Sequence, residues 1–77
     1  MNINIKDTIV LEDNKEYVVV SKAKYLNKVY YYLMDIKNHK NFKFCYEEDD
    51  YLVEEKDEKI LSNLLLLFLK NTINNFK

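Results

Sequence analysis

The sequence contains no glycine, no proline and no tryptophan, and its only cysteine is Cys45. Glycine-rich phosphate loops, dinucleotide-binding turns and nucleophile elbows need the backbone freedom of glycine, so the sequence excludes these motifs. A single cysteine also excludes an intramolecular disulfide framework. Arginine is absent as well, and all 12 basic residues are therefore lysine.

The composition is that of a small folded protein. The 77 residues are 48% apolar and 32% charged, and the formal net charge is -1. Such a chain forms one domain, residues 1–77, and its charge gives no overall indication of nucleic-acid binding. Lysine, asparagine, isoleucine and tyrosine have AT-rich codons and are abundant, whereas alanine occurs once. This bias indicates a low-GC bacterial genome, a phage or another mobile element.

The sequence shows no pattern of a secretory or membrane-spanning segment. Residues 1–7 carry neither the basic region nor the apolar stretch of a signal peptide. The longest apolar run, residues 64–69, has six residues, whereas a helix that spans a bilayer needs about 20. We therefore expect a cytoplasmic protein that is not bound to a membrane.

Residues 1–54 have the pattern of short β-strands joined by turns. Apolar, β-branched and aromatic residues alternate with polar turns, and Asn14 is the best candidate for a positive φ in the first of them. Short connections favour an antiparallel meander, as a half-open small barrel or a curved sheet. The expected strands are residues 8–11, 17–24, 29–36, 42–46 and 51–54.

Residues 57–75 have the pattern of one C-terminal helix. Acidic residues begin it and lysines lie near its end, an order that suits the helix dipole. Leu66 and Leu67 fall outside the apolar stripe that would face the sheet. The expected stripe is Ile60, Leu61, Leu64, Leu65, Phe68, Leu69, Thr72 and Ile73.

The helix carries more apolar residues than one sheet can cover. An apolar edge left in water is unfavourable, so we expect it to bury against a partner protein or against a second copy in a homodimer. The residues of this edge are Leu66, Leu69, Ile73 and Phe76.

Charge is segregated along the chain. Residues 47–58 hold eight acidic residues and one lysine, with residues 47–50 expected to form an acidic turn. Three interpretations are open: a solvated turn, a docking patch for a protein with a basic surface, or a divalent-ion loop. The ion loop is the weakest, because an EF-hand needs spaced oxygen ligands and a glycine. The docking patch would use Glu47, Glu48, Asp49, Asp50, Glu54 and Glu55.

Lysines and tyrosines share the strand region, and this pattern offers an alternative function. Such a sheet binds single-stranded nucleic acid by charge and stacking if the lysines and the exposed tyrosines share one face. Ordinary cross-strand aromatic pairing with solvated lysines explains the same pattern, and the absence of arginine makes nucleic acid the less favoured partner. The alternative face comprises Lys22, Lys24, Lys28, Tyr30, Tyr32 and Lys43.

The sequence offers no convergent set of catalytic or metal-ligating residues. His39 is the only histidine and lies in a polar turn, and Cys45 alternates with aromatic residues as a small buried hydrophobe does. A nucleophilic cysteine needs a base and an orienting group, and the carboxylates lie in one run rather than opposite one another. We therefore expect no enzyme activity, no cofactor and no bound metal.

The chain contains the stretch DTIVLEDNKEY at residues 7–17, a tyrosine-rich strand at 30–33 and the acidic stretch 46–50. In these features it resembles small β-rich proteins of low-GC Gram-positive bacteria and their mobile elements, the YrzB-like domain of unknown function. The resemblance covers residues 7–58 and implies a small cytoplasmic β-rich module, with no activity to transfer. This chain departs from the family because it has no hairpin glycine and a longer leucine-rich helix.

These features together predict an α+β domain with an antiparallel meander in residues 1–54 and a helix in residues 57–75. The favoured function is a non-enzymatic interaction module that docks a basic partner through residues 47–58 and a partner or second copy through the helix. One concrete form is a mobile-element inhibitor of a host defence nuclease, whose acidic residues would occupy a groove built for phosphates.

Overall fold

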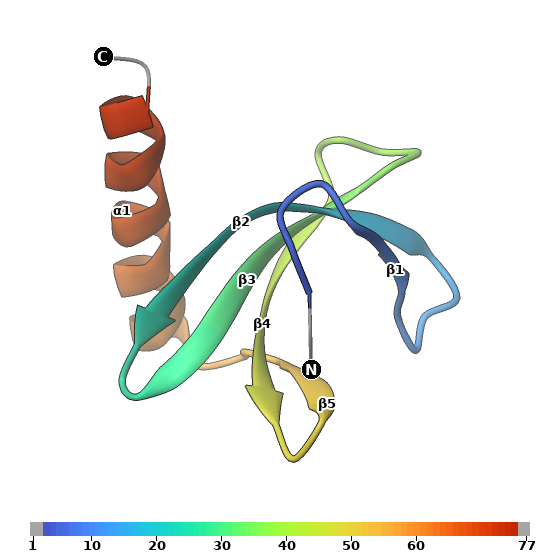
Figure 1. The fold of residues 1–77 in the computed structure, drawn as a ribbon, viewed down its shortest axis with the longest axis horizontal. Coiled ribbons are helices and arrows are strands. Elements are labelled where there is room, and N and C mark those ends of the chain that lie inside the picture. The colour runs from blue at the N-terminus through green and yellow to red at the C-terminus, as the bar shows by residue number, and fades with distance from the viewer. Residues whose placement is uncertain (1–2, 76–77) are drawn as a thin grey trace.

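The chain folds into one antiparallel sheet followed by a helix, and the sheet curls into a half-barrel (Figure 1). The computed structural model describes the backbone of residues 3–75 and the side chains of residues 3–70. The strands follow one another in the sheet as they do in the sequence, which confirms the predicted fold class. The elements are β1 (Thr8–Val10), β2 (Glu16–Tyr25), β3 (Lys28–Asp35), β4 (Phe42–Glu48), β5 (Tyr51–Glu54) and α1 (Glu58–Asn75).

Two of the hairpins close through two-residue turns. Leu26 and Asn27 have φ of 52° and 61°, and Asp49 and Asp50 have φ of 49° and 67°. Positive φ at both central residues is the pattern of a type I′ turn, whose twist matches that of the flanking strands. Asn14 also adopts a positive φ, 61°, as predicted. Asparagine, aspartate and one leucine thus occupy backbone positions for which glycine is usual.

The acidic turn is shorter than predicted. Glu47 and Glu48 belong to β4 and pair with Leu52 and Tyr51 of β5, so the turn consists of two residues rather than four. The tight I′ geometry lets the ladder continue up to the turn itself.

Leu26 is the least suitable of the turn residues, because a β-carbon at positive φ clashes with the following carbonyl. Changing Leu26→Asn together with Asn27→Gly installs the preferred Asn-Gly pair and is expected to raise the free energy of unfolding by about 1 kcal/mol. Urea denaturation measures the change. Asn14→Gly, at a residue type that tolerates positive φ, should give a smaller gain. An unchanged or lower stability of the Leu26 variant would show that the contacts of the leucine side chain stabilise the fold by more than its positive φ destabilises it.

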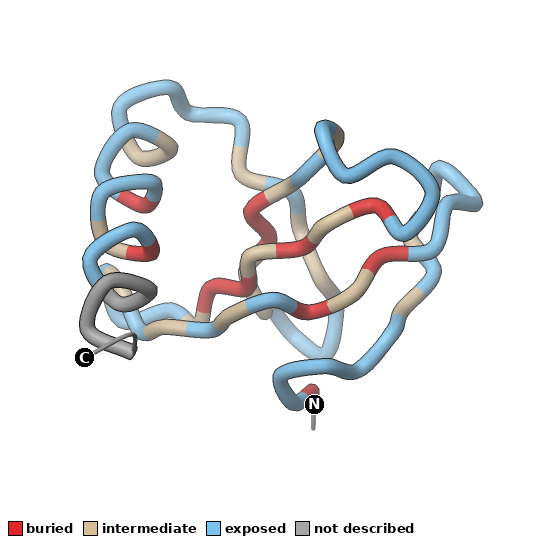
Figure 2. Tube along the Cα trace, turned by 90° about the horizontal axis from the view of Figure 1, so that it is seen from above, coloured by how far each residue is buried: buried red, intermediate tan, exposed pale blue. Residues whose placement is uncertain are grey.

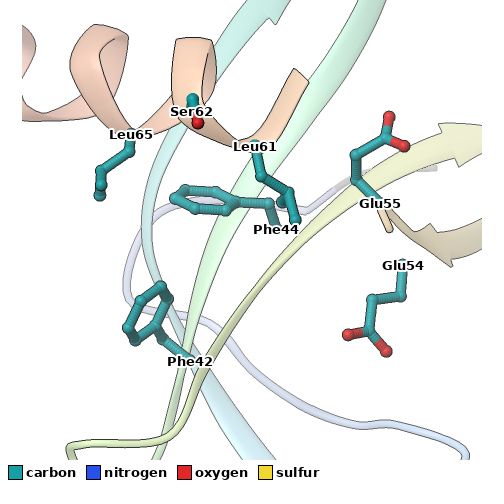
Figure 3. Close-up of a pocket in the computed structure, with 7 residues that line it drawn as sticks. All are labelled: Phe42, Phe44, Glu54, Glu55, Leu61, Ser62 and Leu65. Carbon is teal, nitrogen blue, oxygen red and sulfur yellow. The ribbon is translucent and has the colours of Figure 1, made fainter. Parts of the chain in front are cut away.

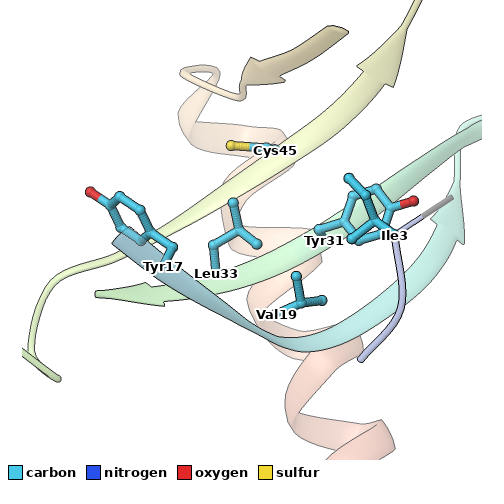
Figure 4. Close-up of a cluster of buried hydrophobic side chains, with 6 residues drawn as sticks. All are labelled: Ile3, Tyr17, Val19, Tyr31, Leu33 and Cys45. Carbon is cyan, nitrogen blue, oxygen red and sulfur yellow. The ribbon is translucent and has the colours of Figure 1, made fainter. Parts of the chain in front are cut away.

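A first hydrophobic cluster, called here the inner cluster, fills the side that the half-barrel encloses (Figure 4). Partly buried residues of both edge strands, Ile9 of β1 and Leu52 of β5, pack against it, so the curl of the sheet covers it. The Lys22 ammonium donates to the Ile3 carbonyl at 3.3 Å and ties the N-terminal segment to this side. The inner cluster comprises Ile3, Tyr17, Val19, Tyr31, Leu33 and Cys45.

A second hydrophobic cluster, the outer cluster, lies between the opposite face of the sheet and α1. Its centre is aromatic: the rings of Phe44 and Phe68 stack with their centroids 5.4 Å apart, and Tyr32 meets Phe68 edge-on at 6.0 Å. Offset and edge-on ring contacts add to the free energy of burial. The buried members of the outer cluster are Tyr30, Phe44, Leu64 and Phe68.

The helix begins at a side-chain cap. Asp57 Oδ1 accepts hydrogen bonds from the backbone N–H of Lys59 at 2.9 Å and of Ile60 at 3.1 Å. Those amides have no partner within the helix, and a carboxylate at this end also interacts favourably with the helix dipole.

The covered face of α1 is narrower than the sequence predicted. Figure 2 shows the buried positions on the side of the helix that faces the sheet, where Leu64 and Phe68 are almost fully buried. Leu65 and Leu69, assigned by periodicity to the covered stripe, are exposed, whereas Leu67 is half-buried. The prediction was wrong here because the helix packs on the sheet through Ile60, Leu61, Leu64 and Phe68, which form a narrower face than the whole apolar stripe. The side chains of Thr72 and Ile73, and all of Phe76, lie outside the described residues.

Candidate functional site

Three leucines form an uncovered edge along α1, called here the leucine edge. Leu65 is 52% exposed, Leu66 67% and Leu69 55%. They lie within about one third of the helix circumference, given 100° per residue. Isolated exposed leucines are common, but three on one edge of a short helix form a continuous apolar surface.

The leucine edge continues into a groove between α1 and β4. The groove has a volume of about 310 Å³, and Figure 3 shows the Phe42 and Phe44 rings of β4 opposite Leu61 and Leu65 of the helix. Phe42 is itself 44% exposed. The polar lining of the groove consists of Ser62, Glu54 and Glu55. An apolar floor with a few polar groups at the rim is typical of a binding surface.

Two residues of the predicted acidic patch hold buried tyrosines. Tyr30 donates its hydroxyl hydrogen to Glu55 Oε1 at 2.6 Å, and Tyr31 donates to Glu47 Oε1 at 2.5 Å. Burial and the hydrogen bond to an ionised carboxylate both raise the pKa of each tyrosine above its usual value of 10.0. Glu47 and Glu55 therefore satisfy hydroxyl groups that would otherwise be buried without partners.

A third acidic residue of the patch belongs to an ion-pair cluster on the inner side of the sheet. Lys43 lies 3.3 Å from a Glu54 oxygen and 3.2 Å from Asp13 Oδ2. Asp13 Oδ2 also accepts the hydroxyl hydrogen of Tyr17 at 2.7 Å. The pKa of Asp13 is lowered from 3.8 to about 2. The hydrogen bond from the Tyr17 hydroxyl has the largest effect, and the bond from the Lys15 amide has the next largest. The cluster joins the β1–β2 turn to β4 and β5.

The predicted acidic patch is therefore divided into two parts. Glu48, Asp49 and Asp50 are exposed at the β4–β5 turn, whereas Glu54 and Glu55 lie at the other end of β5. The turn end is where three neighbouring acidic residues are exposed together, so it is the part of the patch best placed to contact a partner.

The predicted nucleic-acid face is not formed as one surface. Lys22 pairs with Tyr31 and Lys43 with Leu33, both on the side of the inner cluster. Tyr30 is buried beneath α1 on the opposite side. A bulge between Val19 and Ser21 shifts the alternation of β2 and moves its lysines to the inner side. The inner side thus holds Lys22, Lys24 and Lys43, and the outer side holds Lys28, Tyr30 and Tyr32.

Cys45 is a member of the inner cluster. Burial is the largest effect that raises the pKa of its thiol, to about 11, so the sulfur is protonated and weakly nucleophilic at neutral pH. His39 is exposed in the β3–β4 turn. Among the described residues, no three histidine, cysteine or carboxylate side chains are grouped to hold a metal ion. The described part of the chain also contains no helix with the length and hydropathy needed to cross a membrane.

Sequence reasoning missed the tyrosine–carboxylate pairs and the α1–β4 groove. The partners are distant in sequence, 25 residues apart for Tyr30 and Glu55 and 16 for Tyr31 and Glu47. A local pattern cannot show such pairs. The abundance of both tyrosine and acidic residues was the available signal, since a buried tyrosine needs an acceptor for its hydroxyl.

Comparison with known proteins adds no functional assignment. No protein-family model matches the chain, and no curated protein or solved structure is significantly similar to it. The resemblance to the YrzB-like domain stays a prediction.

Proposed function

We propose that this protein is a protein-interaction module that self-associates through α1 and offers its β4–β5 turn to a basic partner. The observation that carries the proposal is the leucine edge together with the adjoining groove. A chain of 77 residues exposes three leucines and Phe42 on one continuous surface. Exposure of such an apolar surface to water is unfavourable, and burial against a second protein surface removes this exposure.

A second copy of this chain is the occupant that the charges favour. Lys59 and Lys70 fall on one flank of the leucine edge, and the acidic rim of the groove, Glu54 and Glu55, lies on the other. When two such helices pair in parallel about a two-fold axis, the basic flank of one meets the acidic flank of the other. The apolar contact supplies the affinity, and the flanking charges set the orientation.

The acidic turn then stays available on each copy. Glu48, Asp49 and Asp50 lie at the β4–β5 turn and are not part of the α1 surface. Neighbouring negative charges attract a positively charged surface and increase its association rate. A dimer would present two such turns, so that a basic partner with two sites would bind more tightly than to a single chain.

The self-association is tested by replacing the leucine edge with charge. The unaltered protein is expected to have the mass of a dimer in size-exclusion chromatography with light scattering, and to keep it at high salt because the contact is apolar. Leu66→Lys combined with Leu69→Lys should give a monomer. The matched control is Val10→Lys combined with Tyr51→Lys, which replaces two apolar residues that are 67% and 72% exposed on β1 and β5.

The two double variants distinguish the surface of α1 from that of the edge strands β1 and β5. The control should remain a dimer, and both variants should keep the circular-dichroism spectrum of the folded protein. A monomeric unaltered protein, or a dimer that survives the leucine-edge substitutions, would contradict self-association through α1.

A further inference from the structure

The half-barrel has two unpaired edges, β1 and β5, each of which is paired on one side alone. The Glu55 amide donates to the Phe44 carbonyl at 2.9 Å, which fixes the alternation of the β4–β5 ladder. By that alternation the backbone groups of Leu52 and Glu54 point away from β4. No described residue hydrogen-bonds to these outward-facing amides. An edge of this kind is a template for an additional strand.

The two edges face each other across a cavity of about 350 Å³, called here the seam. Its apolar lining comes from both sides, with Ile9 and Val10 on β1 and Tyr51 and Leu52 on β5. Val10 and Tyr51 are among the most exposed large apolar residues of the described chain. In a closed meander barrel this space is filled by direct pairing of the first and last strands.

The rim of the seam is acidic. Glu12 and Asp50 line the cavity, and Glu48 lies beside Tyr51 in the β4–β5 ladder. An extended occupant would therefore need basic residues along one face and apolar residues along the other. Alternation provides both, because successive side chains of a strand point to opposite faces. Apolar residues would lie on the face of Leu52, and lysines or arginines on the face of Glu48 and Tyr51.

We propose that the seam binds an extended basic segment of a partner protein, which adds to the free edge of β5 as a sixth strand. Main-chain hydrogen bonds to Leu52 and Glu54 provide the affinity, and the alternating side chains provide the selectivity. The inference rests on the part of the proposed function that assigns a basic partner to the acidic turn. It goes further by naming the conformation of that partner and the edge it occupies.

The probe is a short, capped peptide of alternating lysine and valine, with isotope-labelled full-length protein. We expect amide shift changes in β1 and β5, and slower hydrogen exchange of the Leu52 and Glu54 amides. Three controls test whether the peptide binds as an added strand in the seam. The same peptide with alternate amides N-methylated should bind at least about tenfold more weakly, because it loses ladder hydrogen bonds. The protein variant Val10→Lys with Tyr51→Lys should also lose binding, and Leu66→Lys with Leu69→Lys should keep it.

Each outcome separates the strand-addition inference from the proposed function. Equal binding of the two peptides, weakened by charge reversal at Glu48 and Asp49, would leave the basic partner in place and overturn strand addition. Binding that is insensitive to the same charge reversal would overturn the acidic docking role itself. No binding of the unmodified peptide at concentrations up to about 1 mM would overturn the strand-addition inference and leave edge protection as the role of the acidic rim.

Discussion

Replacing Phe68 by alanine is expected to lower the free energy of unfolding by about 3–5 kcal/mol, the range for a large buried aromatic residue. Phe68 is almost fully buried, stacks on Phe44 and meets Tyr32 edge-on, so it connects α1 to the aromatic centre of the outer cluster. Leu64 is the other buried residue in the described part of the helix, and it lies one turn away from Phe68. Urea denaturation followed by circular dichroism measures the loss.

Leu66→Ala on the same helix is the matched control. Its side chain is exposed, so the change should be within about 0.5 kcal/mol when measured on the monomer. The inner cluster contains no helix residue, so we also expect the helix amides of the Phe68 variant to exchange faster than those of β2 and β3. A loss below about 1 kcal/mol with uniform exchange would show that the outer cluster is not held by this ring.

The parts of the fold that depend on local pattern were predicted from the sequence. The strand around residues 17–24 begins with Tyr17 and three valines, residue types that strands favour, and Asn14 tolerates the positive φ that its turn requires. The helix was predicted because apolar residues recur every three or four positions and acidic residues stand at its start, where the structure shows Asp57 as the N-cap. Each of these signals arises within a few residues of the element that it specifies.

The parts that failed depend on how elements meet in space. Periodicity showed that Leu65 and Leu69 could belong to an apolar face, but the width of the covered face is set by the sheet, which leaves both of these leucines exposed. The bulge between Val19 and Ser21 is a second example, since shifting the alternation by one residue exchanges the two faces of β2 beyond it. Neither the bulge nor the width of the contact has a local sequence signal in this chain.

The acidic segment shows why charge alone did not define a site. Eight acidic residues in 12 positions favour a docking patch, but Glu47, Glu54 and Glu55 each bind a group inside the protein. Their partners come from β3 and β4. These residues are distant in the sequence, and the fold brings them together. A charged run therefore divides into structural and available residues only when the register of the sheet is known.

Replacing Lys43 by methionine is expected to lower the free energy of unfolding by up to about 1 kcal/mol at neutral pH, because it removes the ammonium that pairs with the exposed Asp13 and Glu54 carboxylates. Methionine keeps an apolar stem and removes the ammonium, which lies 5.7 Å from the centre of the Tyr17 ring. Burial alone would lower the pKa of Lys43, but its bonds to Asp13 and Glu54 outweigh burial and raise it, so the ammonium is charged at neutral pH. Lys24→Met, at an exposed lysine on the same side of the sheet, should change the stability by less than about 0.5 kcal/mol.

The cost of losing Lys43 should fall in acid. The pKa of Asp13 is lowered in the folded protein from 3.8 to about 2, first by the Tyr17 hydroxyl and with a contribution from Lys43. A lowered carboxyl pKa stabilises the fold above 3.8, and this stabilisation is lost as the pH falls towards 2, because the folded carboxylate must then also take up its proton. The unaltered protein should therefore lose more stability across this interval than the Lys43→Met variant does, and the two urea midpoints should converge. A difference that stays constant from neutral pH to pH 2 would mean that the Lys43 ammonium stabilises the fold through its contact with the Tyr17 ring, and that its ion pairs to Asp13 and Glu54 contribute nothing.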